Sequence, residues 1–263
     1  MTLPNPQRPP GPTLLLLFLV LILPAHPAAA QGLAGSRNAG GAVLFNLGYG
    51  VFSPAGDLAD RFGGGFALDG GLDYLPAGKN WQFGLMGRFG FGNEVREDVL
   101  AGLRLNNGTI ISNQRSPADV QLRHRHLFLG ARAGYTLALG RKNPRAGLKL
   151  STGLGWLSHW IRVQRDVSQE VIQVEGFRRA GYDRLTGGPA LYQFLGYQQL
   201  ALDRRLNFYA GVEALLGLTR ARRAFDVATA APSPADGRTD LILGARLGII
   251  LPFYRGEGRE IFY

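Results

Sequence analysis

Few residues of this chain are of a type that could do chemistry. Its four histidines are His26, His124, His126 and His159, and it contains no cysteine. Ser158 and His159 are adjacent, so on a strand they point to opposite faces, whereas a serine nucleophile and its base must share one. His124 and His126 share a face and could bind a metal with a third ligand, but "RHRH" at a strand mouth is typical of a solvated basic rim. We therefore predict no catalytic residue and no metal site.

Cofactor chemistry has no better support. The glycine-rich runs "FGGGF" and "GFGNE" are not followed by a helix, so they do not predict a phosphate-binding loop. The chain has 263 residues, of which 46% are hydrophobic and 38 are glycine, and this composition predicts one folded domain. Its net charge of +10 suits nucleic acid, anionic lipid or simple solubility, and does not choose among them. We predict no cofactor.

The N-terminus indicates an exported protein. Thr13–Leu23 ("TLLLLFLVLIL") is an apolar run preceded by Arg8 and followed by Ala28 and Ala30, a small-x-small pair. Such a run is shorter than the roughly 20 residues that span a bilayer as a helix. We predict a cleaved secretory signal over residues 1–30, with a retained N-terminal anchor as the alternative. Because an exported chain rarely meets nucleic acid, we predict no nucleic-acid partner.

Beyond residue 31, large apolar residues alternate with small or charged ones. Eight segments of 12 to 15 residues show this pattern: Gly41–Phe52, Gly64–Leu75, Trp81–Gly92, His126–Leu139, Ala146–Trp160, Leu191–Leu202, Leu206–Thr219 and Thr239–Phe253. They are longer than the five or six residues typical of soluble strands, and long enough for the roughly 10 residues of a tilted membrane strand. The sixth segment is the weakest, because Gln193 and Gln199 lie on its apolar face.

The connections between these segments alternate in length. Pro76–Asn80, Gly140–Arg145 and Asp203–Arg205 are short and rich in turn formers or charge, whereas Ser53–Gly63, Asn93–Arg125, Ile161–Ala190 and Arg220–Arg238 are long. Short periplasmic turns and long external loops are the rule for outer-membrane barrels. We therefore predict an all-β fold, a closed antiparallel transmembrane β-barrel of eight strands over residues 41–254. A short N-terminal segment, residues 31–40, would precede it, and a periplasmic tail, residues 255–263, would follow it.

The two faces of the predicted strands differ as a membrane barrel requires. Lipid cannot hydrogen-bond to the protein, so large apolar residues face outward and polar or small residues face inward. An eight-stranded barrel has an interior that side chains can just fill. Its inner positions carry three acids and four bases, which we expect to pair as a plug rather than line a pore: Asp69, Asp73, Arg88, Arg132, Lys149, Glu213 and Arg246.

A soluble β-sandwich or lipocalin-like barrel is the alternative fold. It would place the apolar residues inside, and it would explain the alternation equally well. It would not explain the aromatic residues near strand ends, among them Tyr74, Trp81, Trp160, Phe208 and Phe253. Aromatic girdles at both interfaces are what a membrane barrel needs, so we favour the membrane barrel.

The long loops contain basic clusters at Arg178, Arg179, Arg220, Arg222 and Arg223, besides "RHRH". A basic rim at headgroup level would pair with lipopolysaccharide phosphates through arginine. The alternative is a solvated loop surface without a ligand. A third possibility is that the loops or the tail dock a partner protein of the envelope. The predicted partners are therefore outer-membrane lipid, lipopolysaccharide and an envelope protein.

From about Gly41 to Tyr254 the chain resembles the small eight-stranded outer-membrane β-barrels of Gram-negative bacteria, similar in plan to the OmpA barrel and OmpX. The stretches "GYDRLTGGPALYQFLGYQQL", "RRLNFYAGVEALLGLTRARR" and "RTDLILGARLGIILPFY" resemble an uncharacterised barrel family of the Bacteroidota. The resemblance implies this fold and a place in the bacterial outer membrane, and little about activity. "GIILPFY" is similar to the aromatic-ended assembly signal of such barrels, although nine further residues follow it.

Together these features predict a non-enzymatic integral outer-membrane β-barrel with a structural or interaction role at the cell envelope, for example as an accessory subunit of an envelope complex. The alternative is a transporter of a small or hydrophobic solute, which some eight-stranded barrels pass through a lateral opening. Conductance in a planar bilayer would distinguish an open lumen from a filled one.

Overall fold

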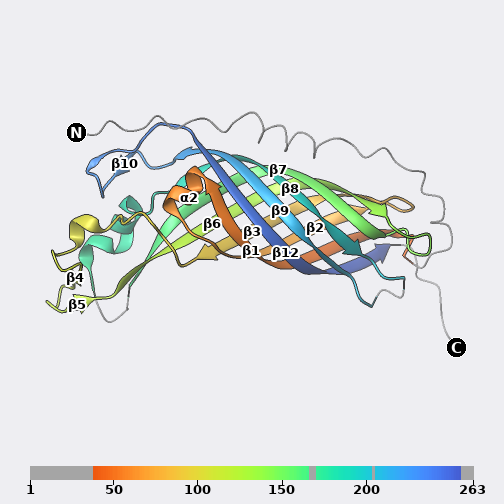
Figure 1. The fold of residues 1–263 in the computed structure, drawn as a ribbon, viewed down its shortest axis with the longest axis horizontal. Helices are drawn as coiled ribbons and strands as arrows, with labels where there is room; N and C mark the ends of the chain where they lie inside the picture. Colours follow the sequence, from red (N-terminus) through yellow and green to blue (C-terminus); the bar gives the residue numbers. More distant parts are fainter. Residues whose placement is uncertain (1–37, 166–169, 203–204, 256–263) are drawn as a thin grey trace.

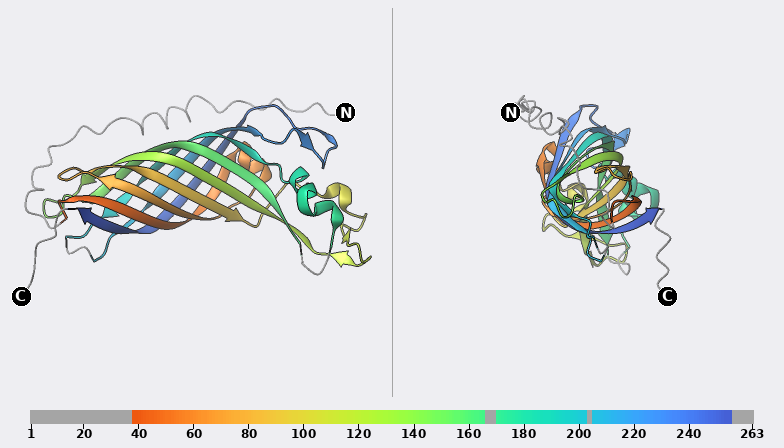
Figure 2. Two further views of the ribbon diagram at one scale, coloured as in Figure 1. Left: turned by 180° about the vertical axis from the view of Figure 1, so that it is seen from behind. Right: turned by 90° about the vertical axis from the view of Figure 1, so that its right-hand side faces the viewer.

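Eight long antiparallel strands close into a ring, as Figure 1 and the end-on view in Figure 2 show. The structure is a computed structural model, and it describes residues 38–165, 170–202 and 205–255. The barrel strands are β1 (Gly41–Gly56), β2 (Gly65–Leu75), β3 (Trp81–Gly92), β6 (Val120–Ala138), β7 (Ala146–Arg165), β8 (Thr186–Gln199), β9 (Phe208–Ala221) and β12 (Arg238–Arg255). The ring closes where β1 pairs with β12, with Gly41 opposite Arg255. The structure thus confirms the predicted all-β, closed, antiparallel eight-stranded barrel.

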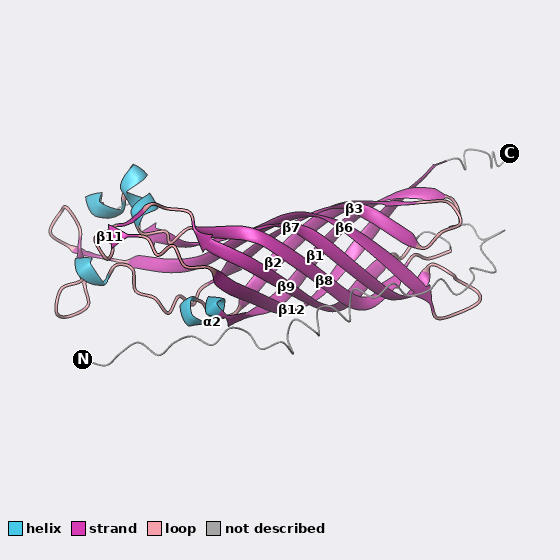
Figure 3. Ribbon diagram, turned by 90° about the horizontal axis from the view of Figure 1, so that it is seen from above, coloured by secondary structure: helices cyan, strands magenta, loops and turns pink. Residues whose placement is uncertain are grey.

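Short turns and long loops lie at opposite ends of the barrel. The turns after β2, β6 and β8 lie at the end where the described chain begins and finishes (Figure 1). The loops at the other end hold the helix α2 (Asp57–Arg61), the 3-10 turns η1 (Ala101–Leu103), η2 (Ile172–Val174) and η3 (Gly176–Gly181), and two small hairpins (Figure 3). The hairpins pair β4 (Ile110–Ile111) with β5 (Pro117–Ala118) and β10 (Phe225–Asp226) with β11 (Ala231–Pro232). No helix of the described residues is long and apolar enough to cross a membrane.

Along the middle of the barrel, apolar side chains face outward and charged side chains face inward. Leu85, Leu154 and Leu247 are 67%, 68% and 64% exposed on the outer wall, whereas Arg88 and Arg246 are 1% and 5% exposed inside. Successive strand residues point to opposite faces, so one register fixes both surfaces. This facing is the reverse of a soluble barrel, whose apolar residues would fill the interior.

Four strands extend at least four residues further into the loops than the sequence predicted. β1 continues to Gly56 instead of ending at Phe52, and β7 continues to Arg165 instead of ending at Trp160. β6 begins at Val120 instead of His126, and β8 begins at Thr186 instead of Leu191. The β6–β7 pairing runs without a break from the short turn to Val120 opposite Arg165. The extensions of β6 and β7 carry polar residues on their outer face, and that of β8 carries Gly187 and Pro189 there, so apolar alternation does not reveal them.

The predicted sixth strand exists as β8, and its glutamine has a structural explanation. Gln193 lies on the outer wall directly opposite Thr152 of β7, whose hydroxyl donates a hydrogen bond of 2.9 Å to the Gln193 side-chain oxygen. Gln193 is buried beneath its neighbours. A polar side chain on the apolar face is therefore covered, and it weakens the sequence pattern without breaking the strand.

The predicted signal peptide, residues 1–30, lies outside the described residues. So do residues 31–37 of the predicted N-terminal segment and residues 256–263 of the predicted tail. Arg255, the first residue of that predicted tail, is the last residue of β12.

Candidate functional site

The seven charged residues predicted for the lumen all lie on the inner face of the barrel, and all are buried. They come from six different strands: Asp69 and Asp73 from β2, Arg88 from β3, Arg132 from β6, Lys149 from β7, Glu213 from β9 and Arg246 from β12. Each belongs to at least one ion pair. We call these seven residues the lumen network.

Asp73 is the central acceptor in the part of the lumen network nearer the short turns. Its two carboxylate oxygens accept hydrogen bonds of 2.8 Å each from the Arg132 guanidinium, and one of them accepts a third, of 2.9 Å, from the Asn46 amide. The Lys149 ammonium lies 4.0 Å away and donates to the side-chain oxygens of Gln82 at 2.6 Å and Gln198 at 2.8 Å. Charge-assisted, two-point bonding of this kind fixes both geometry and position.

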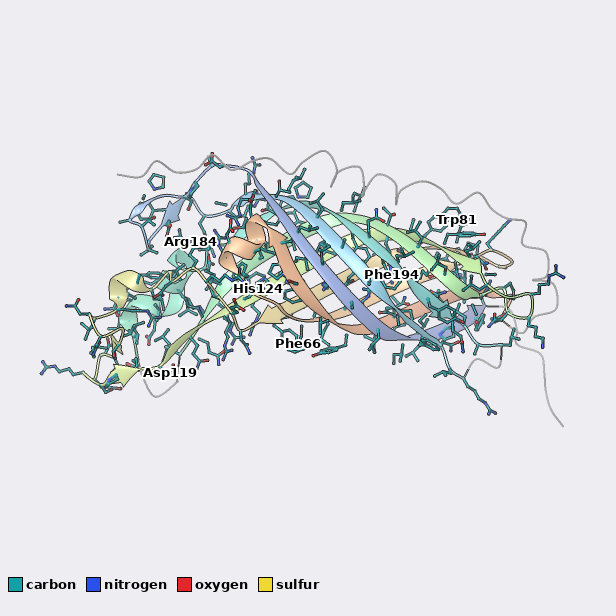
Figure 4. The ribbon with its side chains drawn as sticks, viewed as in Figure 1. Phe66, Trp81, Asp119, His124, Arg184 and Phe194 are labelled. Carbon is teal, nitrogen blue, oxygen red and sulfur yellow. The ribbon has the colours of Figure 1, made fainter. Side chains whose placement is uncertain are left out.

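The rest of the lumen network is built around Arg246. Its guanidinium donates to Asp69 at 2.7 Å and lies 3.5 Å from Glu213, which also pairs with Arg88. The same guanidinium lies 4.8 Å from the ring centroid of Phe194, a residue labelled at mid-barrel in Figure 4. Tyr192 and Tyr209 donate hydrogen bonds of 3.1 and 3.2 Å to Glu213 and Asp69. Opposite charges and aromatic rings therefore fill this cross-section.

Arg145 lies buried at the short-turn end of the lumen, and it was not among the predicted site residues. Its guanidinium donates to backbone carbonyls of Gly40 at 2.8 Å, Ala39 at 3.0 Å and Pro76 at 3.2 Å. Burial lowers the pKa of Arg145. Because arginine carries five donors in a rigid fork, one side chain can bind several carbonyls of adjoining turns.

The histidines near the loop end are buried, which corrects the prediction of a solvated "RHRH" rim. His124, His126 and His159 are each 0% exposed inside the barrel. The His124 ring stacks on Phe62 with 4.0 Å between centroids, and His126 meets Phe52 edge-on at 4.7 Å. The prediction failed because β6 extends past both histidines and turns them inward. Figure 4 labels His124 near the loop end of the barrel.

His159 and Asp240 form a buried polar pair that was not predicted from the sequence. His159 shares a hydrogen bond of 2.7 Å with Asp240, to which the Thr219 hydroxyl also donates. Ser158 and His159 point to opposite faces of β7, as predicted, with His159 inside and Ser158 outside. Among the described residues no group of three or more potential ligands is arranged to hold a metal ion.

A cavity of about 700 Å³ opens among the loops at the end of the barrel. We call it the mouth cavity. Its charged lining comes from all four loops and is balanced in sign: Asp57, Arg61, Glu97, Arg184, Arg223, Asp226, Asp236 and Arg238. Glu97 joins three loops, because it lies 2.7 Å from both Arg61 and Arg184. Burial lowers the pKa of Arg61, and Glu97 opposes that shift.

The five arginines of the predicted basic rim lie on η3 and at the loop end of β9, in different environments. Arg223 donates two hydrogen bonds to Asp183, and these raise its pKa. Arg222 lies over the Trp156 ring at 4.8 Å, and Arg220 lies on the outer face of β9 opposite Gly187. Arg178 and Arg179 are exposed on η3.

Comparison with known proteins finds only distant likeness. No protein-family model matches the chain, and no curated protein matches it. Among solved structures, the attachment invasion locus protein Ail of Yersinia pestis, in complex with the heparin analogue sucrose octasulfate, is similar with a TM-score of 0.38 and 11% identity, over 80% of this chain and 99% of that one. Neisserial surface protein A is similar with a TM-score of 0.39 and 10% identity, over 79% of this chain and 96% of that one. Likeness at this level assigns neither family nor function.

Proposed function

We propose that this chain is a non-enzymatic integral protein of the bacterial outer membrane with a structural or interaction role at the cell envelope. The observation that carries the proposal is a closed barrel with an apolar outer wall and a charged, buried interior. An apolar wall of this extent would be a liability in water, whereas lipid stabilises it and the closed ring leaves no strand edge unpaired.

Aromatic residues support a spanning band bounded at both ends. Near the short turns, the Trp81 ring lies 5.0 Å from Tyr135 and 6.1 Å from Phe83. Near the loops, Phe66 lies 6.3 Å from Phe91, and Phe89 lies 6.3 Å from Trp160. Figure 4 labels Trp81 and Phe66 toward these two ends. Two such girdles are typical of barrels whose apolar band matches the bilayer.

The interaction role would belong to the loops. Side chains fill the lumen, so the mouth cavity and the outer wall are the surfaces left for binding. The mouth cavity has the size of a small-ligand site, and ion pairs between loops hold its walls in place. Its balanced charge suits a polar partner without strong net charge, such as a segment of another envelope protein.

The transport alternative is favoured by one feature of the wall. The pairing of β8 with β9 skips Gly188 and Pro189, where proline supplies no N–H to the ladder. An outer pocket of about 620 Å³ lies there, lined by Trp156, Pro189 and Leu218 among others. Passage would require the two strands to part, since Gly188 packs closely against the Leu218 backbone.

A disulfide lock would test the transport alternative. Gly187 and Arg220 are paired across β8 and β9, and the chain has no cysteine of its own. Cells expressing the Gly187→Cys/Arg220→Cys variant would be assayed for uptake of the fluorophore N-phenyl-1-naphthylamine. Uptake that falls on oxidation and returns on reduction would support transport, and uptake indifferent to the lock would oppose it.

The main proposal predicts a definite cellular behaviour. The folded protein should fractionate with the outer membrane, and unheated samples should migrate faster on a denaturing gel than boiled ones, because a closed barrel resists detergent. Recovery in the soluble periplasm, or identical mobility before and after boiling, would contradict it.

A further inference from the structure

Three arginines gather on the outer wall where β6 and β7 extend toward the loops. Arg123 and Arg125 alternate along β6 with His124 and His126. Because both histidines are fully buried inside the barrel, both arginines face outward. Arg162 of β7 faces outward for the same reason, since its neighbour Ile161 is buried. We call Arg123, Arg125 and Arg162 the arginine cluster.

The strand register places the arginine cluster in one compact group. Arg123 lies directly opposite Arg162, so their β-carbons are about 5 Å apart. Arg125, two residues along β6, lies between Phe91 of β3 and Trp160 of β7 in the same row. The cluster thus begins within the loop-end aromatic girdle and continues beyond it, away from the apolar band.

None of the three arginines has an ion-pair partner among the residues that the structure describes. Arg123 donates to the side-chain oxygen of Gln121, and Arg125 donates to the backbone oxygen of His124 at 2.6 Å. Like charges directly opposite each other destabilise a strand pair. Three adjacent positive charges without a counter-charge among the described residues would therefore be stabilised by an external anion.

Other arginines at this end of the molecule do have partners. Arg165, farther along β7, lies 3.0 Å from Glu175. Arg184 pairs with Glu97 and Asp226, and Arg223 pairs with Asp183. Arg220 and Arg222 of the loop end also have no ion pair among the described residues, but the arginine cluster differs in that its members lie on paired positions of neighbouring strands.

We propose that the arginine cluster binds a phosphate group of a phosphorylated glycolipid in the outer leaflet, of the lipid A type. The inference rests on the proposed membrane location and adds to it a specific lipid and a specific site. Guanidinium forks match phosphate oxygens two at a time, and Arg125 beside Trp160 keeps its charge at the depth where headgroup and acyl chain meet. A free phosphate ion would satisfy the charges but would gain nothing from the adjacent apolar wall.

Binding can be measured on the full chain refolded in a non-ionic detergent, by native mass spectrometry with purified bisphosphorylated lipid A. The test variant is Arg123→Gln/Arg162→Gln. The matched control is Arg141→Gln/Lys142→Gln, which removes the same charge from exposed residues in the short turn of the same β6–β7 hairpin. Heat-dependent gel mobility verifies that each variant is a folded barrel.

The arginine cluster should dominate lipid A affinity. We expect the test variant to bind at least about tenfold more weakly for each arginine removed, and the control to bind like the parent. Arg123→Lys/Arg162→Lys should recover part of the loss, because charge returns without the fork. Lipid A stripped of both phosphates should bind weakly to every variant.

Two results would overturn the inference while leaving the proposed membrane barrel intact. One is a folded test variant that binds lipid A as tightly as the parent. The other is equal affinity of the parent for phosphorylated and dephosphorylated lipid A, which would assign binding to the acyl chains alone. If millimolar inorganic phosphate displaced lipid A completely, the site would be an anion site without glycolipid preference, which also contradicts the proposal.

Discussion

Asp73 shows how a single residue organises charge inside a narrow barrel. It is 1% exposed and contacts Arg132, Asn46 and Lys149, each from a different strand. A buried ion pair is weak evidence for stability, because desolvation offsets much of the attraction. Removing one partner is a different matter, since it leaves the remaining charges buried and uncompensated.

We therefore expect Asp73→Asn to lower the free energy of unfolding by about 3–5 kcal/mol. Asp98→Asn is the control, because Asp98 pairs with Arg104 on an exposed loop and its loss should cost less than about 1 kcal/mol. Urea unfolding in lipid vesicles, followed by tryptophan fluorescence, measures both. Equal shifts for the two variants would show that the lumen network is not tightly coupled.

Glycine on the inner face makes room for larger neighbours. A β-carbon at Gly90 would overlap the His126 ring, which packs directly over it, whereas one at Gly70 on the outer wall would meet only ordinary contacts at 3.8 Å. We expect Gly90→Ala to reduce the yield of heat-modifiable barrel and Gly70→Ala to leave it unchanged. A fully folded Gly90→Ala variant would mean that the histidines can repack at little cost.

At the scale of the strand, the outer wall should be sensitive to charge according to depth. Leu247 of β12 lies between Tyr49 and Ala210 in the middle of the wall and is 64% exposed, while Leu139 is 69% exposed beyond the end of β6. Leu247→Arg should cost about 2–4 kcal/mol in a bilayer, and Leu139→Arg about 1 kcal/mol or less. Refolding yield into vesicles distinguishes them. Similar yields would indicate that this wall does not face lipid.

The strands were predictable where apolar outward residues alternate with small or charged inward residues. Trp81–Gly92 was predicted with its observed bounds, because both of its ends coincide with the apolar band. β6 and β7 were predicted too short. Their loop-end residues carry Arg123 and Arg162 on the outer face, so apolar and polar residues no longer alternate there. β8 was predicted to start late because "TGGP" is typical of a loop, although tertiary pairing holds Thr186 and Gly187 in the sheet.

The alternation of faces along each strand was enough to place the inner charges, but not to identify their partners. It shows that Asp73 and Arg132 both point inward. Which residues then meet across the lumen depends on the stagger between strands in the closed barrel. Arg145 and the pair of His159 with Asp240 gave no signal, because each joins residues far apart in the sequence. The mouth cavity was unpredictable for the same reason, since residues from four loops line it.

Along the whole molecule, buried polar, aromatic and aliphatic side chains occur at every level of the lumen. Arg145 binds the carbonyls at the short turns, the lumen network occupies the middle, and Phe128 and Leu157 are buried above it. The stacked Phe62 and His124 rings and the loop ion pairs follow at the mouth. If the barrel lies in the outer membrane as proposed, a lumen built in this way would separate two compartments and leave the outer surfaces to interact with lipid and partners.

Conductance across a planar lipid bilayer tests this central claim most directly. Protein reconstituted from detergent, with its closed state verified by heat-dependent mobility, should give no steady ion current, because the lumen network and the rings around it leave no continuous water path. Stable, well-resolved channel steps that vanish in Arg88→Glu would contradict the filled lumen and would place solute transport ahead of the interaction role.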